Sequence, residues 1–97
     1  MPAYLIVETK VKDPEKYAQY IAKVPDIAAK FGGRYLARSN KVESLFGGWK
    51  PERMIILEFP SEEKIRRWLD SAEYRAIAPF REAGAETRAV ILDGSVD

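Results

Sequence analysis

The sequence contains neither cysteine nor histidine among its 97 residues. Without cysteine there is no disulfide, no thiolate nucleophile and no cysteine-ligated metal. Without histidine there is no imidazole general base, no Ser-His-Asp triad, no histidine-ligated zinc and no proximal ligand for haem. We therefore expect no resident metal or cofactor. Any chemistry must come from carboxylates, arginine, lysine, tyrosine, serine or a borrowed cofactor.

A strong net charge and long apolar runs are also missing. Sixteen basic and fifteen acidic side chains leave a formal net charge of +1, so no overall field attracts the chain to nucleic acid or anionic lipid. No apolar run approaches the length of a membrane span, and Met1-Pro2-Ala3-Tyr4 lacks the regions of a signal peptide. We expect a cytoplasmic protein with no nucleic-acid or membrane partner.

What the chain does contain is typical of a folded globular protein. Hydrophobic residues make up 46% and charged residues 32% of the sequence, which is the balance of ordered rather than disordered chains. A chain of this length is expected to form one domain, covering residues 1–97.

Hydrophobic periodicity in the first third predicts a strand followed by a helix. Ala3–Val11 is rich in β-branched and aromatic residues, as strands are. Asp13 is expected to cap a helix with an apolar stripe, which Gly32-Gly33 ends. Pro25 lies inside that stripe and is expected to kink or split the helix near Val24.

The remaining two thirds predict strands and helices in the order strand, strand, helix, strand. Gly47-Gly48 marks a hairpin turn, and Ser39-Asn40-Lys41 indicates a bulge or bend. The expected segments are a strand at 34–38, extended chain at 42–46, a strand at 52–59, a helix capped by Ser61, a helical stretch recapped by Ser71 that Pro79 bends or ends, and a strand at 86–93.

This order is the β-α-β-β-α-β arrangement of ferredoxin-like domains, an α+β fold. We expect a four-stranded antiparallel sheet with helices on one face. The run Met54-Ile55-Ile56-Leu57 does not alternate between apolar and polar residues, which indicates that both faces of the sheet are covered. Tyr4, Ile6, Met54 and Ile56 would form an apolar patch on the helix-free face, so we expect a second copy of the chain to cover it.

The sequence resembles the bacterial domain-of-unknown-function family 1330, within the dimeric α/β-barrel superfamily. The resemblance runs almost end to end, and its most specific part is the block from Gly32 to Ser61. It is carried by Asp13-Pro14, Tyr17, Tyr20, Gly32-Gly33-Arg34-Tyr35-Leu36-Ala37-Arg38, Glu43, Trp49-Lys50-Pro51-Glu52-Arg53, Leu57-Glu58-Phe59-Pro60-Ser61, Trp68, Ser71-Ala72-Glu73-Tyr74 and Arg81.

The resemblance implies a homodimer whose two sheets face each other around a cavity that often holds small organic molecules. It implies no established activity. The sequence departs from the family at Ser39-Asn40, where many relatives are rich in glycine, and we expect that difference at one rim of the cavity.

Charged residues on the helix-free face give the candidate site. Glu8 and Glu58 are expected on neighbouring central strands, where a covered carboxylate needs a partner. Arg34, Arg38, Arg53 and Lys10 are the candidate partners. One interpretation is a salt-bridge network that fixes the register of the dimer.

The other interpretation is a binding and catalytic site on the same face. Glu58 would act as the proton acceptor, because burial raises the pKa of a carboxyl group. Arg38 and Arg53 would bind an anionic substrate, with Glu43 and Trp49 nearby. Trp68, Tyr17 and Tyr20 are interpreted as core residues.

Two functions remain open at this point. The first is a cofactor-independent acid/base enzyme, similar to an isomerase or monooxygenase, that acts on a small anionic or aromatic metabolite between the two sheets. The second is a non-catalytic dimeric module that binds a ligand or a protein partner. An acid/base residue inside a closed cavity would favour the first.

Overall fold

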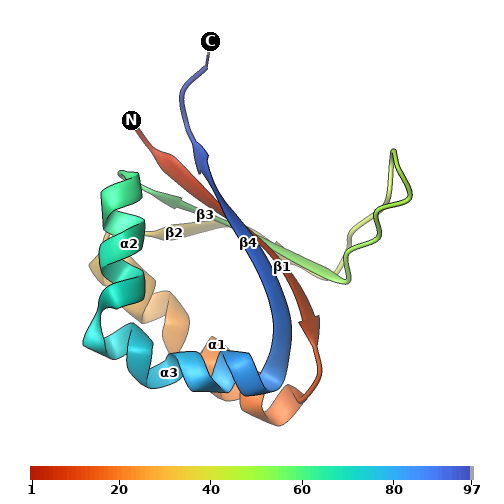
Figure 1. Cartoon of the computed structure of the whole chain (residues 1–97), viewed down its shortest axis with the longest axis horizontal. Helices are drawn as coiled ribbons and strands as arrows, with labels where there is room; N and C mark the ends of the chain where they lie inside the picture. The colour runs from red at the N-terminus through yellow and green to blue at the C-terminus, as the bar shows by residue number, and fades with distance from the viewer. Residues whose placement is uncertain (97) are drawn as a thin grey trace.

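The computed structural model describes residues 1–96. Its elements, in chain order, are β1 (Ala3–Val11), α1 (Pro14–Lys30), β2 (Arg34–Ser39), β3 (Arg53–Phe59), α2 (Glu62–Asp70), α3 (Ala72–Gly84) and β4 (Ala85–Asp93). The strands form one layer and the helices pack along one side of it, as Figure 1 shows. Within the described residues no helix is long and apolar enough to cross a membrane.

The sheet has the strand order β2-β3-β1-β4, and every neighbouring pair is antiparallel. This arrangement confirms the predicted ferredoxin-like fold, with the helical segment between β3 and β4 divided into α2 and α3. β1 and β3 are the two central strands, so Glu8 and Glu58 lie on neighbouring strands as expected. Burial alternates along β1, where Leu5 and Val7 face the helices and Ile6 and Glu8 face away.

Helix α1 begins as its sequence predicts. The Asp13 carboxylate accepts hydrogen bonds from the backbone N–H groups of Glu15 and Lys16, at 3.1 and 3.3 Å. The helix then continues through Pro25 to Lys30, so of the two expected effects of this proline, a kink or a split, the split does not occur. Burial of Val24 and Ile27 on either side of the proline holds both halves of the helix against the core.

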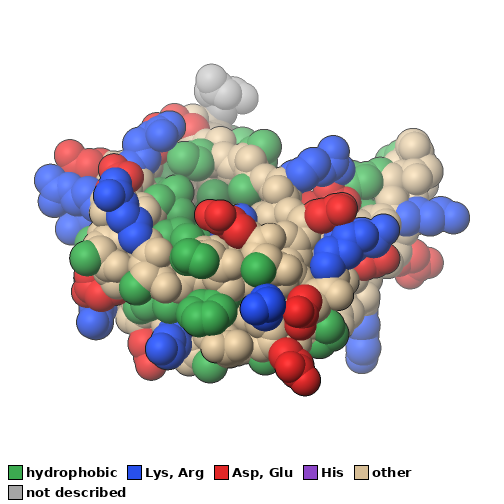
Figure 2. Space-filling view, turned by 60° about the horizontal axis from the view of Figure 1, so that its bottom comes forward, with side chains coloured by type: hydrophobic (Ala, Val, Ile, Leu, Met, Phe, Trp, Pro, Cys, Tyr) green, Lys and Arg blue, Asp and Glu red, His purple; other side chains and the backbone are tan. Residues whose placement is uncertain are grey.

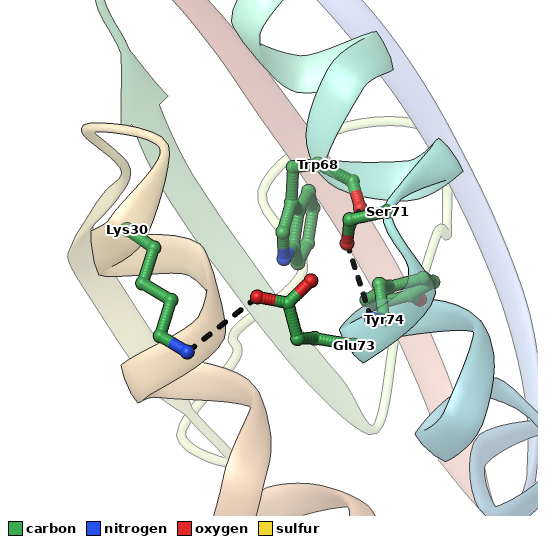
Figure 3. Close-up of polar contacts among 5 residues, drawn as sticks. All are labelled: Lys30, Trp68, Ser71, Glu73 and Tyr74. Atoms are coloured by element: carbon green, nitrogen blue, oxygen red, sulfur yellow. Dashed lines mark hydrogen bonds and ion pairs between the residues drawn. The ribbon is translucent and has the colours of Figure 1, made fainter.

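Helices α2 and α3 meet at Ser71, which serves both. Its hydroxyl donates to the carbonyl oxygen of Trp68 at 2.7 Å and accepts from the N–H of Tyr74 at 3.1 Å (Figure 3). The same serine therefore closes the end of α2 and caps the start of α3. Helix α3 continues past Pro79 to Gly84, so of the two expected effects of this proline, termination does not occur.

The edge strand β2 agrees with its prediction in one respect and differs in two. A bend occurs at Asn40, which confirms one of the two alternatives predicted for Ser39-Asn40-Lys41. A bulge that was not predicted lies between Tyr35 and Ala37, where Leu36 is the extra residue. Residues 42–46, which were expected to continue extended, pair with no described strand, because the ladder between β2 and β3 ends where Ser39 meets Met54. The chain instead forms a long loop between β2 and β3 (Figure 1).

The core lies between the sheet and the helices. Its centre is a series of aromatic rings in which Phe59 contacts Trp68, Trp68 contacts Tyr74 and Tyr74 contacts Tyr20, with centroids 5.2, 4.8 and 6.0 Å apart. Each of these four side chains is buried. This packing positions three helices on one sheet face and leaves polar groups of Tyr20 and Tyr74 inside the molecule.

Candidate functional site

The residues of the predicted site face opposite sides of the sheet. Glu58 pairs in register with Tyr4 and points to the helix-free face. Arg38 is opposite the buried Ile55, and Arg53 is opposite the buried Thr9, so both belong to the helix side. Arg38 lies on the helix side because the extra residue in β2 shifts the alternation of the strand by one position.

Glu58 and Glu8, the two carboxylates predicted for the helix-free face, both have arginine partners. Glu58 accepts from Nε of Arg34 at 2.8 Å. Glu8 accepts from Nε of Arg88 at 2.8 Å, and the hydrogen bond with Arg88 lowers the pKa of Glu8 below its usual value. Arg34 was among the expected partners, whereas Arg88 on β4 was not.

The other predicted residues lie apart from Glu58. Trp49 donates from Nε1 to the second carboxylate oxygen of Glu8 at 3.3 Å. Arg53 donates to the side-chain oxygen of Asn40 at 2.8 Å, and Glu43 is exposed in the loop between β2 and β3. Trp49 therefore lies against the helix-free face, while Arg53 anchors the end of that loop.

A cavity of about 240 Å³ lies on the opposite side of the sheet, between the strands and the helices. Its walls come from every element of the fold and are mainly aromatic and aliphatic. Its lining consists of Leu5, Val7, Thr9, Tyr17, Tyr20, Ile21, Tyr35, Ile55, Leu57, Trp68, Leu69, Tyr74, Arg81, Thr87 and Ala89. Ala89 of the edge strand β4 is exposed although its side chain belongs to this cavity, which places an opening beside β4.

Three polar side chains form a connected network on the cavity wall. The hydroxyl groups of Tyr20 and Tyr74 lie 2.9 Å apart, and Nε of Arg81 donates to the Tyr74 hydroxyl at 3.2 Å. Burial, followed by the neighbouring Tyr74, raises the pKa of Tyr20 far above its usual value, so Tyr20 is neutral near pH 7. The network therefore offers hydrogen bonds from phenol hydroxyl groups and from one cation.

Arg81 is the charged residue of this cavity. Among the described residues seven ion pairs occur, and none of them includes Arg81. The lining contains no aspartate, glutamate or lysine. A partly buried guanidinium that has no carboxylate partner among residues 1–96 can pair with an anion.

Two further lining residues carry buried polar atoms without a hydrogen-bond partner in residues 1–96. They are Nε1 of Trp68, whose side chain is 2% exposed, and Oγ1 of Thr87. A buried donor left unpaired costs free energy, and a ligand or water that reached it would remove that cost. Arg38 also belongs to this side of the sheet, where its guanidinium carbon lies 4.9 Å from the ring centroid of Tyr35.

Other parts of the described surface are less suited to bind a ligand. A hollow of about 510 Å³ follows the outside of α2, but each of its charged side chains has a partner, as Arg66 has Glu62 at 2.8 Å. Figure 2 shows acidic and basic side chains interspersed over the helix side of the molecule. Within residues 1–96 no three acidic side chains gather to hold a metal ion.

Sequence reasoning missed this cavity because its residues have the pattern of a core. Trp68, Tyr17 and Tyr20 were interpreted as core residues, and they are buried, but they also line the cavity. The signal available in the sequence was Arg81, a charged residue two turns after Tyr74 and one turn after Ile77 on the inner stripe of its helix. Arg81 was noted as part of the family pattern, without a role.

Comparison with solved structures shows the same fold in proteins of low sequence identity. A protein of unknown function from Rhodopseudomonas palustris superposes with a TM-score of 0.83 at 17% identity, covering 99% of this chain and 84% of that one. SnoaB, a cofactor-independent oxygenase from Streptomyces nogalater, gives a TM-score of 0.71 at 12% identity, covering 99% and 95%. A dimeric ferredoxin-like protein of unknown function from Jannaschia sp. CCS1 gives 0.72 at 10% identity, covering 96% and 99%.

Comparison with curated proteins found no match. The family model described as a domain of unknown function, DUF1330, matches residues 2–95, which is nearly the whole chain. The match agrees with the sequence pattern from Gly32 to Ser61 and with the observed fold. The chain therefore belongs to the DUF1330 family.

Proposed function

We propose that the protein is a homodimer that binds one small aromatic acid per subunit, in the cavity between its sheet and its helices. The observation that supports this most directly is Arg81, a cation on the cavity wall that has no carboxylate partner within residues 1–96. The aromatic side chains Trp68, Tyr17 and Tyr20 provide flat apolar walls for a ring, and Arg81 provides the counter-charge for its acid group.

The proposal moves the ligand away from the space between two sheets, where the sequence had placed it. Glu8 and Glu58 each have an arginine partner, so neither is free to bind or to act as a base without breaking an ion pair. In the proposal these ion pairs help to fix the register of the dimer. Arg38 and Arg53 lie on the cavity side of the sheet and have a structural role there. The cavity size of about 240 Å³ suits a small ligand.

The absence of a carboxylate from the cavity lining favours binding over acid/base catalysis. A second candidate is a reaction that the bound anion undergoes itself, without a protein base. The arrangement of Arg81, Tyr74 and Tyr20 favours it, because hydrogen-bond donors stabilise developing negative charge. SnoaB, which has the same fold, is described as a cofactor-independent oxygenase.

The experiment is a thermal-shift screen of small benzoic, phenolic and enolic acids, each beside its neutral amide or ether. We expect some acids, but not their neutral analogues, to raise the melting temperature of the wild type. Arg81→Gln should lose this shift. Arg75→Gln is the matched control, because Arg75 lies on the same helix but is exposed and paired with Asp70 at 3.5 Å. If no acid stabilises the wild type, or if Arg81→Gln responds as the wild type does, the proposal is wrong.

The second candidate is tested with the acids that bind. Oxygen consumption and product formation are measured with the purified protein, in parallel with Arg81→Gln. Turnover by the wild type that the variant lacks would favour catalysis. Binding without turnover would leave the protein as a binding module.

The homodimer is supported by the composition of the helix-free face. An apolar row of Ala37, Ile56, Ile6 and Val90 crosses its centre in register, and Val90 is 60% exposed in the single chain. The ion pairs of Glu58 and Glu8 lie on either side of this row, so the face can be covered without leaving an unpaired carboxylate. A second copy would bury roughly 1,200–2,000 Å² in total.

A further inference from the structure

The loop between β2 and β3 presents its largest apolar side chains to solvent. We define residues 40–52 as the arm. At its tip Leu45 is 82% and Phe46 is 86% exposed. Gly47 and Gly48 follow with positive φ angles of 81° and 67°, and a Cβ placed on either would meet no atom within 4 Å. The tip therefore extends into open space in the single chain.

The base of the arm is fixed, in contrast to its tip. Nε1 of Trp49 donates to Glu8, and Arg53 donates to Asn40 at 2.8 Å. The backbone N–H of Lys41 donates to the Ser39 hydroxyl at 2.9 Å, and Pro51 is buried. These contacts hold both ends of the arm, so its two apolar side chains are presented at a defined place rather than on a free tail.

The arm extends on the side of the sheet that carries no helix. Trp49 borders a shallow hollow together with Ile6, Met54 and Val90, all of which belong to the helix-free face. Figure 1 shows the loop between β2 and β3 projecting from the end of the sheet on the side away from the helices. A molecule stacked on the helix-free face would therefore lie alongside the arm.

We propose that the tip, Leu45 and Phe46, packs against the second copy of the chain, so that each subunit of the dimer clasps the other with its arm. This inference depends on the homodimer proposed above and adds the residues that hold it together. A lipid surface fits less well, because Lys41 and Lys50 in the arm are balanced by Glu43 and Glu52, whereas membrane-binding segments are rich in basic residues. Burial of two apolar side chains against a partner removes their surface from water, which stabilises the dimer.

The first test places a benzophenone amino acid at position 46 and irradiates the purified full chain. The chain contains no cysteine, so a covalent dimer on a denaturing gel cannot be a disulfide. We expect a covalent dimer from position 46 and none from position 23, an exposed site on α1 on the other side of the sheet. Light scattering on each sample gives the oligomeric state before irradiation.

The second test measures the dimer dissociation constant by dilution. The double variant Leu45→Ser/Phe46→Ser should raise it about tenfold or more, because both side chains lose their burial in the dimer. Lys41→Ser is the matched control in the same loop and should leave it unchanged. Circular dichroism checks that each variant is folded.

The two proposals fail in different ways. A wild-type dimer that gives no covalent dimer from position 46, or whose dissociation constant changes less than twofold in the double variant, overturns the clasp and leaves the homodimer standing. A wild-type monomer by light scattering overturns both.

Discussion

Tyr20 and Tyr74 come from different helices and meet in a hydroxyl pair inside the protein. Burial raises the pKa of Tyr20, which means that the folded state holds this proton more firmly than the unfolded state does. The stabilisation that results is fully present below the unfolded pKa of about 10 and is lost as the pH rises above it.

Tyr20→Phe tests this linkage. Near pH 8 the variant should be less stable than the wild type by about 1 kcal/mol, because one hydrogen bond is lost. Above about pH 10 the wild type loses stability through Tyr20 and the variant does not, so the difference should shrink. Urea unfolding at several pH values measures the difference in unfolding free energy between the two proteins. A difference that stays constant to about pH 11 would show that Tyr20 ionises normally.

Glycine is required at position 33 because an aromatic ring lies close to its backbone. A Cβ at position 33 would lie 2.5 Å from the Cζ atom of Phe59, whose side chain is 0% exposed and cannot move aside. We expect Gly33→Ala to cost about 1–3 kcal/mol of unfolding free energy, as overpacked cores do. The double variant with Phe59→Leu should cost less than the sum of the two single variants. Simple additivity in a denaturant titration would contradict the steric explanation.

At the scale of elements, Ser71 joins α2 to α3 through two hydrogen bonds of one hydroxyl group. Ser61 caps only α2, by accepting from the N–H of Lys64 at 3.3 Å. We expect Ser61→Ala to cost about 1 kcal/mol of unfolding free energy and Ser71→Ala to cost more, up to about 2 kcal/mol. The two variants are compared by chemical denaturation. Equal losses would mean that the junction is held by packing alone.

The elements themselves were largely predictable, because local signals define them. Capping residues such as Asp13, Ser61 and Ser71 act on N–H groups two or three residues away, and the sequence places them directly. That Pro25 does not split α1 was not predictable, because packing of the buried helix stripe outweighs one missing hydrogen bond. The extra residue Leu36 also carries no local sign, since its presence depends on pairing with β3.

The candidate site was less predictable than the fold. The face of the sheet on which each residue of β2 lies depends on the extra residue Leu36. The alternation read from the sequence therefore put Arg38 and Glu58 on the same face, whereas they lie on opposite faces. The partner of Glu8 is Arg88, eighty positions along the chain, and only the strand order brings them together. A core aromatic and an aromatic that lines a cavity have the same sequence pattern, and the space between them appears only in three dimensions.

At the scale of the whole molecule, the apolar row on the helix-free face predicts how the subunits associate. Ile56→Lys places a charge in the centre of this row and should yield a monomer of about the chain mass of 11.0 kDa. Ala29→Lys is the control, since Ala29 is exposed on α1 on the other side of the sheet. Light scattering at micromolar concentration compares them. A dimeric Ile56→Lys protein would place the interface elsewhere.

The extra residue in β2 has a consequence for how the length of this chain can change. Removing Leu36 would let Tyr35 and Ala37 follow each other opposite Leu57 and Ile56 with every side chain still on its present face. A deletion of Tyr35 or Ala37 can be accommodated in the same way, with Leu36 in the vacated position. A deletion farther along the strand that removed the bulge would reverse the facing of the residues between it and Leu36. Among homologous chains, a one-residue gap in this strand is therefore expected at or beside Leu36, and an alignment that places the gap farther away would exchange inward and outward positions between the two places.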